Sequence, residues 1–328
     1  MISLTQNSSV KTFSRIGFSL VAATVFSTLL SIVILLPLSS PENMAKAFEL
    51  LGSAMLLLTY IPQFGFLLVY WLFVRGLSKH DCLQREGLKA GELIQIFLIM
   101  YSVSIFFNIL GSVFTQNVSG SNDALENISL LVSTGLPVAI MIPVILGPVV
   151  EELIFRKLTI DRTIGYGEKA AIIFSALMFG LFHGNLTQFL FATSVGIFLG
   201  YVYCKTGKIL LTMILHILIN SIGSLLMLLS SSIVSGDSSS SKILIILVCM
   251  LFIGMVIAGI VMLIRWLKMK AFRFNESVPM LIPNDEIFKT VYFAPGVALY
   301  TLLQIVTIVM SLLHIELPIS SSGNSMFI

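Results

Sequence analysis

The chain is organised as long apolar segments separated by short polar ones. Nine apolar stretches are each long enough to cross the hydrocarbon core of a bilayer as a helix of about 17 to 25 residues. The turn Gly184-Asn185 alone separates the fifth stretch from the sixth, so this pair is the weakest part of the count. The stretches lie near 16–38, 50–74, 93–115, 128–150, 170–187, 188–204, 209–230, 243–264 and 290–313.

Composition agrees with this pattern. Of the 328 residues, 57% are hydrophobic and only 11% are charged, which lies far outside the range of soluble globular domains. The sequence therefore predicts an all-α, polytopic membrane helix bundle with about 8–9 transmembrane helices. The net charge of +3 does not indicate nucleic-acid binding, because no basic cluster is interleaved with aromatic residues.

The basic residues predict the orientation of the bundle. If the N-terminus is cytoplasmic, 17 of the 19 Lys and Arg residues fall in cytoplasmic segments, and only Lys46 and Lys242 lie outside. This bias follows the positive-inside rule and favours a cytoplasmic N-terminus. Solvated loop charges without a topological role would not sort into alternate loops.

Three regions follow from the pattern. We expect N-terminal transmembrane helices in 1–127, a core in 128–230, and C-terminal helices in 231–328 that include a basic cytoplasmic loop at 265–289. The first apolar stretch is longer than a signal peptide's and is interpreted as a retained anchor. The Ser-rich stretch 230–241 reads as an outer loop. The three cysteines, Cys82, Cys204 and Cys249, form no spaced pair, so neither a disulfide framework nor a thiolate zinc site is predicted.

Few ionisable residues lie within the apolar stretches. Two histidines, His183 and His216, occur inside stretches five and seven, and Glu151 and Glu152 follow stretch four. An ionisable group at membrane depth costs several kcal/mol unless it is paired or solvated, which makes each of these residues a functional candidate.

The two glutamates cannot have the same role. On a helix, Glu152 and Arg156 share a face at i and i+4, whereas Glu151 is rotated by roughly 100°. We expect Arg156 to pair with Glu152 and to leave Glu151 free to point into a cavity. The preceding Gly147-Pro148 can kink or restart the helix. Taken alone, this stretch could equally be a charge cluster at the lipid headgroups.

The two histidines each belong to a pair with helical spacing. Phe179 precedes His183 by four residues, and Asn220 follows His216 by four. His216 and Asn220 together could stabilise an oxyanion on a scissile carbonyl. Singly, each histidine is more typical of an interhelical hydrogen bond.

Other polar and small residues are set aside from the site. His80 and His314 have no comparable partners and are left out. Gly196 and Gly200 are assigned to close helix packing.

Together these residues resemble the CPBP family of intramembrane proteases, which includes the CAAX prenyl proteases and the bacteriocin-processing and self-immunity proteins. The three family motifs stand in order within about 130–230 as Glu151-Glu152-x-x-x-Arg156, Phe179-x-x-x-His183 and His216-x-x-x-Asn220. Each motif alone is weak, but three in order are specific. The flanking regions 1–125 and 240–328 resemble no known family.

The resemblance implies an endopeptidase that cleaves a peptide bond in or beside the membrane. Glu151 would be the general base for a water that His183 also holds, and His216 and Asn220 would form the oxyanion site. Glu152, Arg156 and Phe179 would support them. A zinc site formed by Glu151, His183 and His216 is the alternative, and the metal-free version is favoured because no His-Glu-x-x-His pattern is present.

Judged from the positions of the nearest basic residues, Glu151, His183 and His216 are expected at different depths in the membrane. They can meet if the helix that carries Glu151 continues to about Leu158, with the side chains of Arg156 and Lys157 snorkelling to the surface, and if the helix of His183 begins below the membrane surface. The meeting of these groups in one wet pocket is the central structural prediction.

Two other functions remain open at this point. A non-catalytic membrane partner for immunity or regulation would keep the motifs as a polar packing core. A transporter or proton relay ranks last, because its polar residues would be distributed across the bilayer. For the enzyme, we expect a peptide or membrane-protein substrate, a bacterial cytoplasmic membrane and an active site toward the cytoplasm. The oligomeric state is not predicted.

Overall fold

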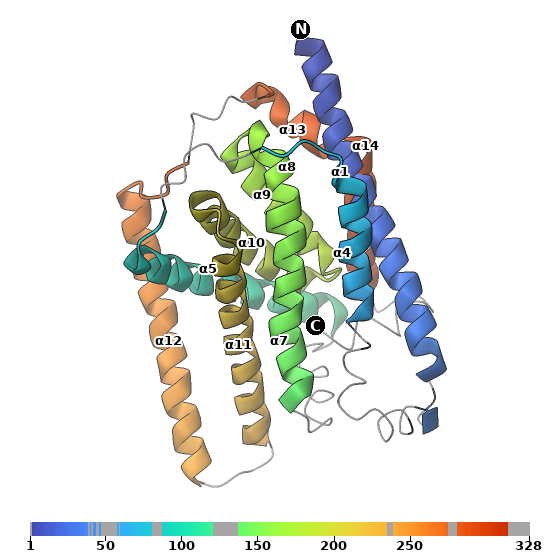
Figure 1. Cartoon of the computed structure of the whole chain (residues 1–328). Helices are drawn as coiled ribbons and strands as arrows, with labels where there is room; N and C mark the ends of the chain where they lie inside the picture. The colour runs from blue at the N-terminus through green and yellow to red at the C-terminus, as the bar shows by residue number, and fades with distance from the viewer. Residues whose placement is uncertain are drawn as a thin grey trace.

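The computed structural model describes residues 2–38, 60–80, 87–120, 137–234, 239–274 and 281–313, with isolated positions between 40 and 58. Within these ranges the chain is helical and contains no strand (Figure 1). The main helices are α1 (Ile2–Leu35), α4 (Ile61–Val74), α5 (Ala90–Ser119), α7 (Pro137–Glu152), α9 (Glu168–Phe182), α10 (Leu186–Thr206), α11 (Ile209–Val234), α12 (Ser239–Lys268), α13 (Asn284–Tyr292) and α14 (Pro295–Leu312).

The all-α, polytopic membrane bundle is confirmed. Among the described residues, five helices are long and apolar enough to cross a membrane, and two shorter apolar helices accompany them. α7 and α9, with 16 and 15 described residues, are too short to be counted among these five helices. The five spans are Asn7–Leu38, Ala90–Ser119, Leu186–Thr206, Ile246–Lys268 and Pro295–Leu312, and the shorter helices are Ile61–Val74 and Ile209–Leu225.

Two boundaries explain how the apolar stretches divide. The fifth and sixth stretches are separate helices, because Gly184 turns the chain with φ +67° and the Asn185 side chain then caps α10 by accepting from the Gln188 N–H at 2.9 Å. The ninth stretch, expected at 290–313, is interrupted. α13 ends at Tyr292, and α14 begins at Pro295, where a proline is tolerated because the first helical N–H has no partner.

Several sequence predictions fall wholly or partly outside the described residues. These are Cys82, His314, the beginnings of the stretches at 50–74 and 128–150, residues 235–238 of the Ser-rich stretch and residues 275–280 of the basic loop.

The helices pack in two groups. In one group α1 packs against α4 and α14, and in the other α10 packs against α9 and α5. α11 packs against α7, while α5 runs across the other helices in the view of Figure 1. Gly196 and Gly200 hold α10 close to α9, as predicted: a Cβ at Gly196 would lie 3.0 Å from the Cα of Ala176, and one at Gly200 would lie 3.2 Å from the Ile172 side chain.

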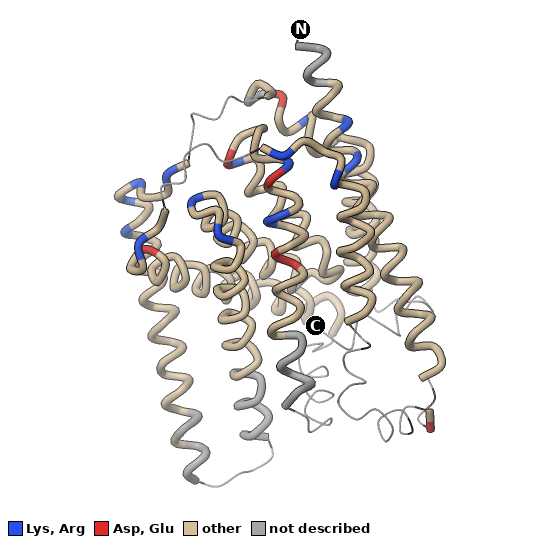
Figure 2. Tube along the Cα trace, viewed as in Figure 1, with Lys and Arg blue, Asp and Glu red and all other residues tan. Residues whose placement is uncertain are grey.

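Charged residues are unevenly distributed along the bundle. Figure 2 shows that the Lys and Arg residues of the described chain gather at the end of the bundle that carries the N-terminus. The uneven charge agrees with the sorting of basic residues in the sequence.

The helices α1 and α14 approach each other closely. A Cβ at Gly17 would overlap the backbone of Gly296, and the Gly296 N–H donates to the Ser14 hydroxyl at 3.0 Å. We therefore expect Gly17→Ala to lower the free energy of unfolding by about 1–3 kcal/mol, because the helices must separate. Gly254→Ala in α12 is the matched control, since a Cβ there meets nothing within 4 Å.

Thermal unfolding of the detergent-solubilised protein gives the unfolding midpoints of Gly17→Ala and Gly254→Ala. The control should be neutral or slightly stabilised, because alanine favours a helix over glycine. Equal midpoints for the two variants would contradict the close α1–α14 contact.

Candidate active site

The helix that carries the glutamates changes its winding directly after them. α7 runs through Gly147 and Pro148 without a break and ends at Glu152, and a π-helical segment, η2 (Leu153–Ile160), continues the same rod. The expected extension to about Leu158 is confirmed. The helix does not restart at Gly147-Pro148, because a proline inside a helix removes only one backbone hydrogen bond and the helix tolerates this loss here.

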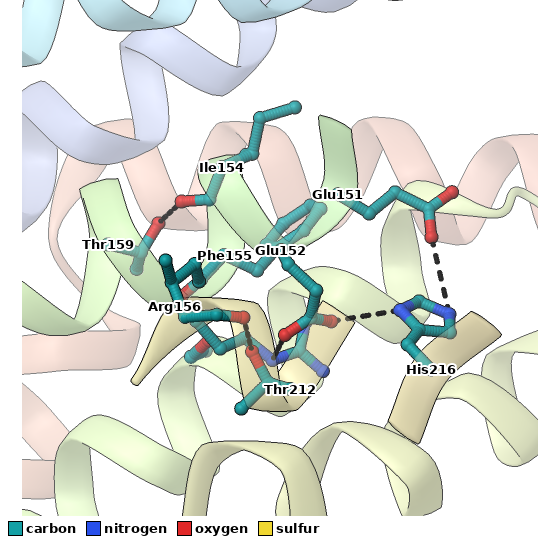
Figure 3. Close-up of polar contacts among 10 residues, drawn as sticks. Glu151, Glu152, Ile154, Phe155, Arg156, Thr159, Thr212 and His216 are labelled. Carbon is teal, nitrogen blue, oxygen red and sulfur yellow. Dashed lines mark hydrogen bonds and ion pairs between the residues drawn. The ribbon is translucent and has the colours of Figure 1, made fainter. Parts of the chain in front are cut away.

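Side chains from neighbouring positions satisfy the carbonyl groups of the π-helical segment (Figure 3). The Thr159 hydroxyl donates to the Ile154 carbonyl at 2.8 Å, and the Ser175 hydroxyl of α9 donates to the Phe155 carbonyl at 2.6 Å. The Tyr70 hydroxyl of α4 lies 2.7 Å from the Thr159 hydroxyl. Because π-helical turns occur mostly as short insertions at functional sites, η2 marks this region as a candidate site.

Glu152 and Arg156 form a fully buried ion pair. The Arg156 Nε lies 3.2 Å from Glu152 Oε2, and both side chains are 0% exposed, so the predicted i and i+4 pair is confirmed. The prediction that Arg156 snorkels to the membrane surface is wrong. Its guanidinium Cζ instead lies 4.5 Å from the centroid of the Phe179 ring, where a cation–π contact adds to the ion pair. The Lys157 side chain is 46% exposed, and its Nζ lies 2.8 Å from Asp161.

His216 lies between the two glutamates, as Figure 3 shows. Its Nδ1 is 2.9 Å from Glu152 Oε1, and its Nε2 is 3.6 Å from Glu151 Oε2. An ionised carboxylate only accepts hydrogen bonds, so the proton of this short contact belongs to Nδ1 of the imidazole. Glu151 forms no ion pair with Arg156 among the described contacts, and its side chain is 12% exposed and shares His216 with Glu152.

Phe179 joins the three motifs. Its ring centroid lies 5.0 Å from that of His183 and 5.6 Å from that of His216, with interplanar angles of 79° and 84°. His183 is the residue directly after the last turn of α9, and its Nδ1 lies 2.9 Å from the Phe179 carbonyl. Because a carbonyl only accepts, this contact leaves Nε2 of His183 as the nitrogen that can interact elsewhere. Glu151 is close enough for its charge to act on His183.

The remaining predicted residue is less constrained. Asn220 stands one turn beyond His216 on α11 and is half-buried, and its amide makes no hydrogen bond to the described part of the chain. The structure thus brings six of the seven predicted site residues into direct contact with at least one other member. Asn220 is placed by its helix alone.

The sequence prediction missed three polar residues around the site. Thr212 precedes His216 by one turn and lies close to Glu152, and its hydroxyl donates to the Ile209 carbonyl at 2.9 Å. Its spacing from His216 is a signal that could have identified it. Ser175 similarly precedes Phe179 by four residues. Tyr60, which is buried at the start of α4, lies close enough to Glu151 for the two groups to interact electrostatically. No local pattern could link Tyr60 to residues about 90 positions away.

The zinc alternative requires three ligands that converge. In the described part of the chain, no group of three or more His, Cys, Asp or Glu side chains is arranged to hold a metal ion. Glu151, His183 and His216 therefore do not converge as a ligand set in this arrangement. The metal-free version stays a prediction.

The segment of the chain that contains the site is similar to known proteins. Residues 133–222 match the sequence model of the family described as "Type II CAAX prenyl endopeptidase Rce1-like". The chain is also 28% identical, over 170 residues, to the "Putative membrane peptidase YdiL" of Bacillus subtilis (strain 168). That match covers 47% of this chain, and the chain spans 65% of the relative's length. No solved structure matches.

The matched segment 133–222 contains all seven predicted site residues. The bacteriocin-processing subtype stays a prediction, because neither description concerns it. Both matched descriptions name peptidases, which agrees with the resemblance of the three motifs to the CPBP family of intramembrane proteases.

Proposed function

We propose that the protein is an intramembrane endopeptidase in which Glu151 activates a water molecule. The observation that carries this proposal is the position of His216 between two carboxylates, at 2.9 Å from Glu152 and 3.6 Å from Glu151. One carboxylate orients the imidazole, and the other lies next to its second nitrogen. A buried base beside an oriented imidazole is the arrangement that water attack on an amide requires.

Glu151 and His183 act on the water. Glu151 accepts one proton as the water oxygen attacks the scissile carbonyl carbon, and Nε2 of His183 accepts a hydrogen bond from the other O–H and orients the attack. The carbonyl oxygen becomes an oxyanion. When the carbon–nitrogen bond breaks, Glu151 returns its proton to the leaving amine, so the products are a carboxylic acid and an amine.

His216 and Asn220 face the developing oxyanion. A protonated His216 donates through both ring nitrogens, so Nε2 is available while Glu152 holds Nδ1. Asn220 is free to donate its amide, because it makes no hydrogen bond to the described residues. Glu152 and Arg156 are positioning residues that set the orientation of the imidazole.

The surroundings of Arg156 support a hydrated site. Its Nε, Nη1 and Nη2 atoms are buried and make no hydrogen bond to the described protein groups, and the same is true of Glu152 Oε2. The ion pair at 3.2 Å therefore has a favourable distance but not the geometry of a hydrogen bond. Buried polar groups of this kind are normally satisfied by protein or by water, which favours water beside Glu151 and Glu152.

The mechanism is proposed without a metal, and its substrate is a peptide or the tail of a membrane protein. The protein would act in the bacterial cytoplasmic membrane with the site toward the cytoplasm. The main alternative is a non-catalytic membrane partner that keeps the polar cluster only to pack its helices. This alternative predicts that the function survives a neutral replacement of Glu151.

Glu151→Gln tests the catalytic role. The amide keeps the size of the side chain but cannot accept the proton, so we expect peptide cleavage to fall by about 10²–10⁴-fold. Comparing the membrane peptidomes of cells that carry the native protein or the variant measures the loss. Glu42→Gln is the matched control, because Glu42 is 77% exposed and pairs only with Lys46. Unchanged peptidomes and phenotype, at normal protein level, would favour the non-catalytic partner.

The supporting ion pair predicts an effect on stability. Arg156→Met leaves the Glu152 charge buried without its cation, and we expect a loss of about 3–5 kcal/mol in the free energy of unfolding. Adding Glu152→Gln removes the buried charge and should recover most of this loss. Lys46→Met is the control, because it breaks an exposed pair of the same i and i+4 spacing that contributes at most about 1 kcal/mol.

Denaturant unfolding in detergent measures the free energy of unfolding of the native protein, Arg156→Met, the double variant and Lys46→Met. The double variant should nevertheless cleave poorly, because His216 loses its anionic partner. A double variant that is as unstable as Arg156→Met would contradict the buried charge as the cause.

Topology can be tested by thiol labelling in whole bacterial cells. In a Cys82→Ser background, we expect Ser238→Cys to react with an impermeant maleimide from outside, and Ser78→Cys to react only after the membrane is opened. Cys204 is buried and Cys249 lies on an apolar helix, so neither should contribute a background signal. The reverse labelling pattern would overturn the proposed cytoplasmic N-terminus.

A further inference from the structure

A polar cavity lies away from the candidate active site. It has a volume of about 250 Å³ and is lined by the N-terminal part of α1, the segment after α4, the turn that follows η2 and Leu281. This volume is smaller than the roughly 300–1,000 Å³ of a pocket for a drug-sized ligand, so the cavity suits a small group rather than a peptide. Its polar lining residues are Ser8, Thr12, Ser78, His80, Arg162 and Tyr166.

Arg162 brings a buried positive charge to this cavity. The residue is 1% exposed, its Nε donates to the Val74 carbonyl at 2.7 Å, and its Nη1 donates to the Leu158 carbonyl at 2.8 Å. Its Nη2 makes no hydrogen bond to the described chain. The adjacent Asp161 is engaged elsewhere, because it binds Lys157 and accepts from the Tyr203 hydroxyl. Among the described residues, Arg162 therefore has no carboxylate in an ion pair.

A buried cation without a counter-ion is costly, and this cost favours an anionic ligand. Burial lowers the pKa of Arg162 below its usual range, because it disfavours the charged guanidinium. An anion in the cavity would stabilise the charged form and so oppose this lowering. The nearby end of α4 compensates only in part, because a helix C-terminus carries roughly −0.5 of a charge. A second guanidinium shares that end, since Arg15 Nε donates to the Phe73 carbonyl at 2.7 Å.

The other lining groups are hydrogen-bonding groups without negative charge. Tyr166 and His80 lie side by side, with ring centroids 6.5 Å apart, and the His80 N–H donates to the Asp161 carbonyl and ties the segment after α4 to α8 (Asp161–Thr163). Ser8 and Ser78 add hydroxyl groups from two further segments. None of the described lining residues carries a carboxylate.

Three features thus coincide here: a small cavity, a buried guanidinium that has no ion pair with a described carboxylate, and several donors that approach from different segments. Arg15 stands at the edge, where its Nη2 lies 3.3 Å from the position that a Cβ at Gly76 would occupy. Guanidinium groups combined with hydroxyl and imidazole donors are the chemistry that recognises phosphate oxygens. We propose that this cavity binds a phosphoryl group, with Arg162 as the main charge and Tyr166 and His80 as donors.

The phosphoryl group can come from a free phosphate or from the headgroup of an anionic lipid, and both sources present the same oxygens to Arg162. The cavity shares no residue with the candidate active site, so the inference holds whether or not the chain is a peptidase.

Binding is tested on the full-length protein in two arms. In the first, inorganic phosphate is titrated into the protein in neutral detergent, with chloride at equal ionic strength as the reference. In the second, the protein is placed in lipid discs of phosphatidylcholine with or without phosphatidic acid. The thermal unfolding midpoint should rise in at least one arm, because a ligand that binds only the folded state stabilises it. A rise only with phosphate identifies a free phosphate, and a rise only with phosphatidic acid identifies a lipid headgroup.

Variants locate the bound group. Tyr166→Phe combined with His80→Phe removes two donors while keeping the aromatic packing of residue 166 against Phe13, and we expect phosphate or phosphatidic acid to bind about tenfold more weakly. Arg162→Lys should weaken binding further, and the double variant serves as the test if Arg162→Lys does not fold. Tyr101→Phe in α5 is the matched control and should bind as the native protein does.

Glu151→Gln should also keep native phosphate binding, which separates this inference from the proposed catalysis. A midpoint that responds to neither probe, or a response that the double variant leaves undiminished, would overturn the proposal.

Discussion

The buried carboxylate of Glu152 is the interaction on which the site depends. It lies at 0% exposure between the guanidinium of Arg156 and the imidazole of His216, and so it connects η2 to α11. A charge at this depth is tolerated only because two cationic or donor groups meet it. The same arrangement fixes the orientation of His216 toward Glu151, so one electrostatic requirement both holds two helices together and positions the reacting groups.

The π-helical segment solves a geometric problem that the ion pair creates. Arg156 has to turn inward toward Glu152 and Phe179, although the next residue in the chain, Lys157, reaches the surface. Wider winding over Leu153–Ile160 places Arg156 in the interior while Lys157 remains half exposed. The hydroxyl groups of Thr159 and Ser175 satisfy carbonyl groups of the segment, so the irregular winding leaves these two acceptors bonded inside the bundle.

The two polar regions of the protein differ in how their charges are balanced. In the candidate active site, two carboxylates lie beside a guanidinium and an imidazole, and the consequence is a set of oriented groups of both signs. In the cavity beside Arg162, the described lining residues are donors without a carboxylate. The first arrangement suits bond cleavage through proton transfer, and the second suits the binding of an anion.

Local properties of the sequence determined the membrane bundle, most helix positions, the Glu152–Arg156 pair and the packing at Gly196 and Gly200. Hydrophobic length and helical spacing act between residues that are near in the chain, so the sequence alone could predict them. Only the tertiary structure decided that His216 binds Glu152, that Phe179 contacts Arg156 and both histidines, and that Arg156 is buried rather than at the membrane surface. These contacts join residues up to 64 positions apart. Their geometry depends on how whole helices pack and on the π-helical segment, which the residue pattern does not predict.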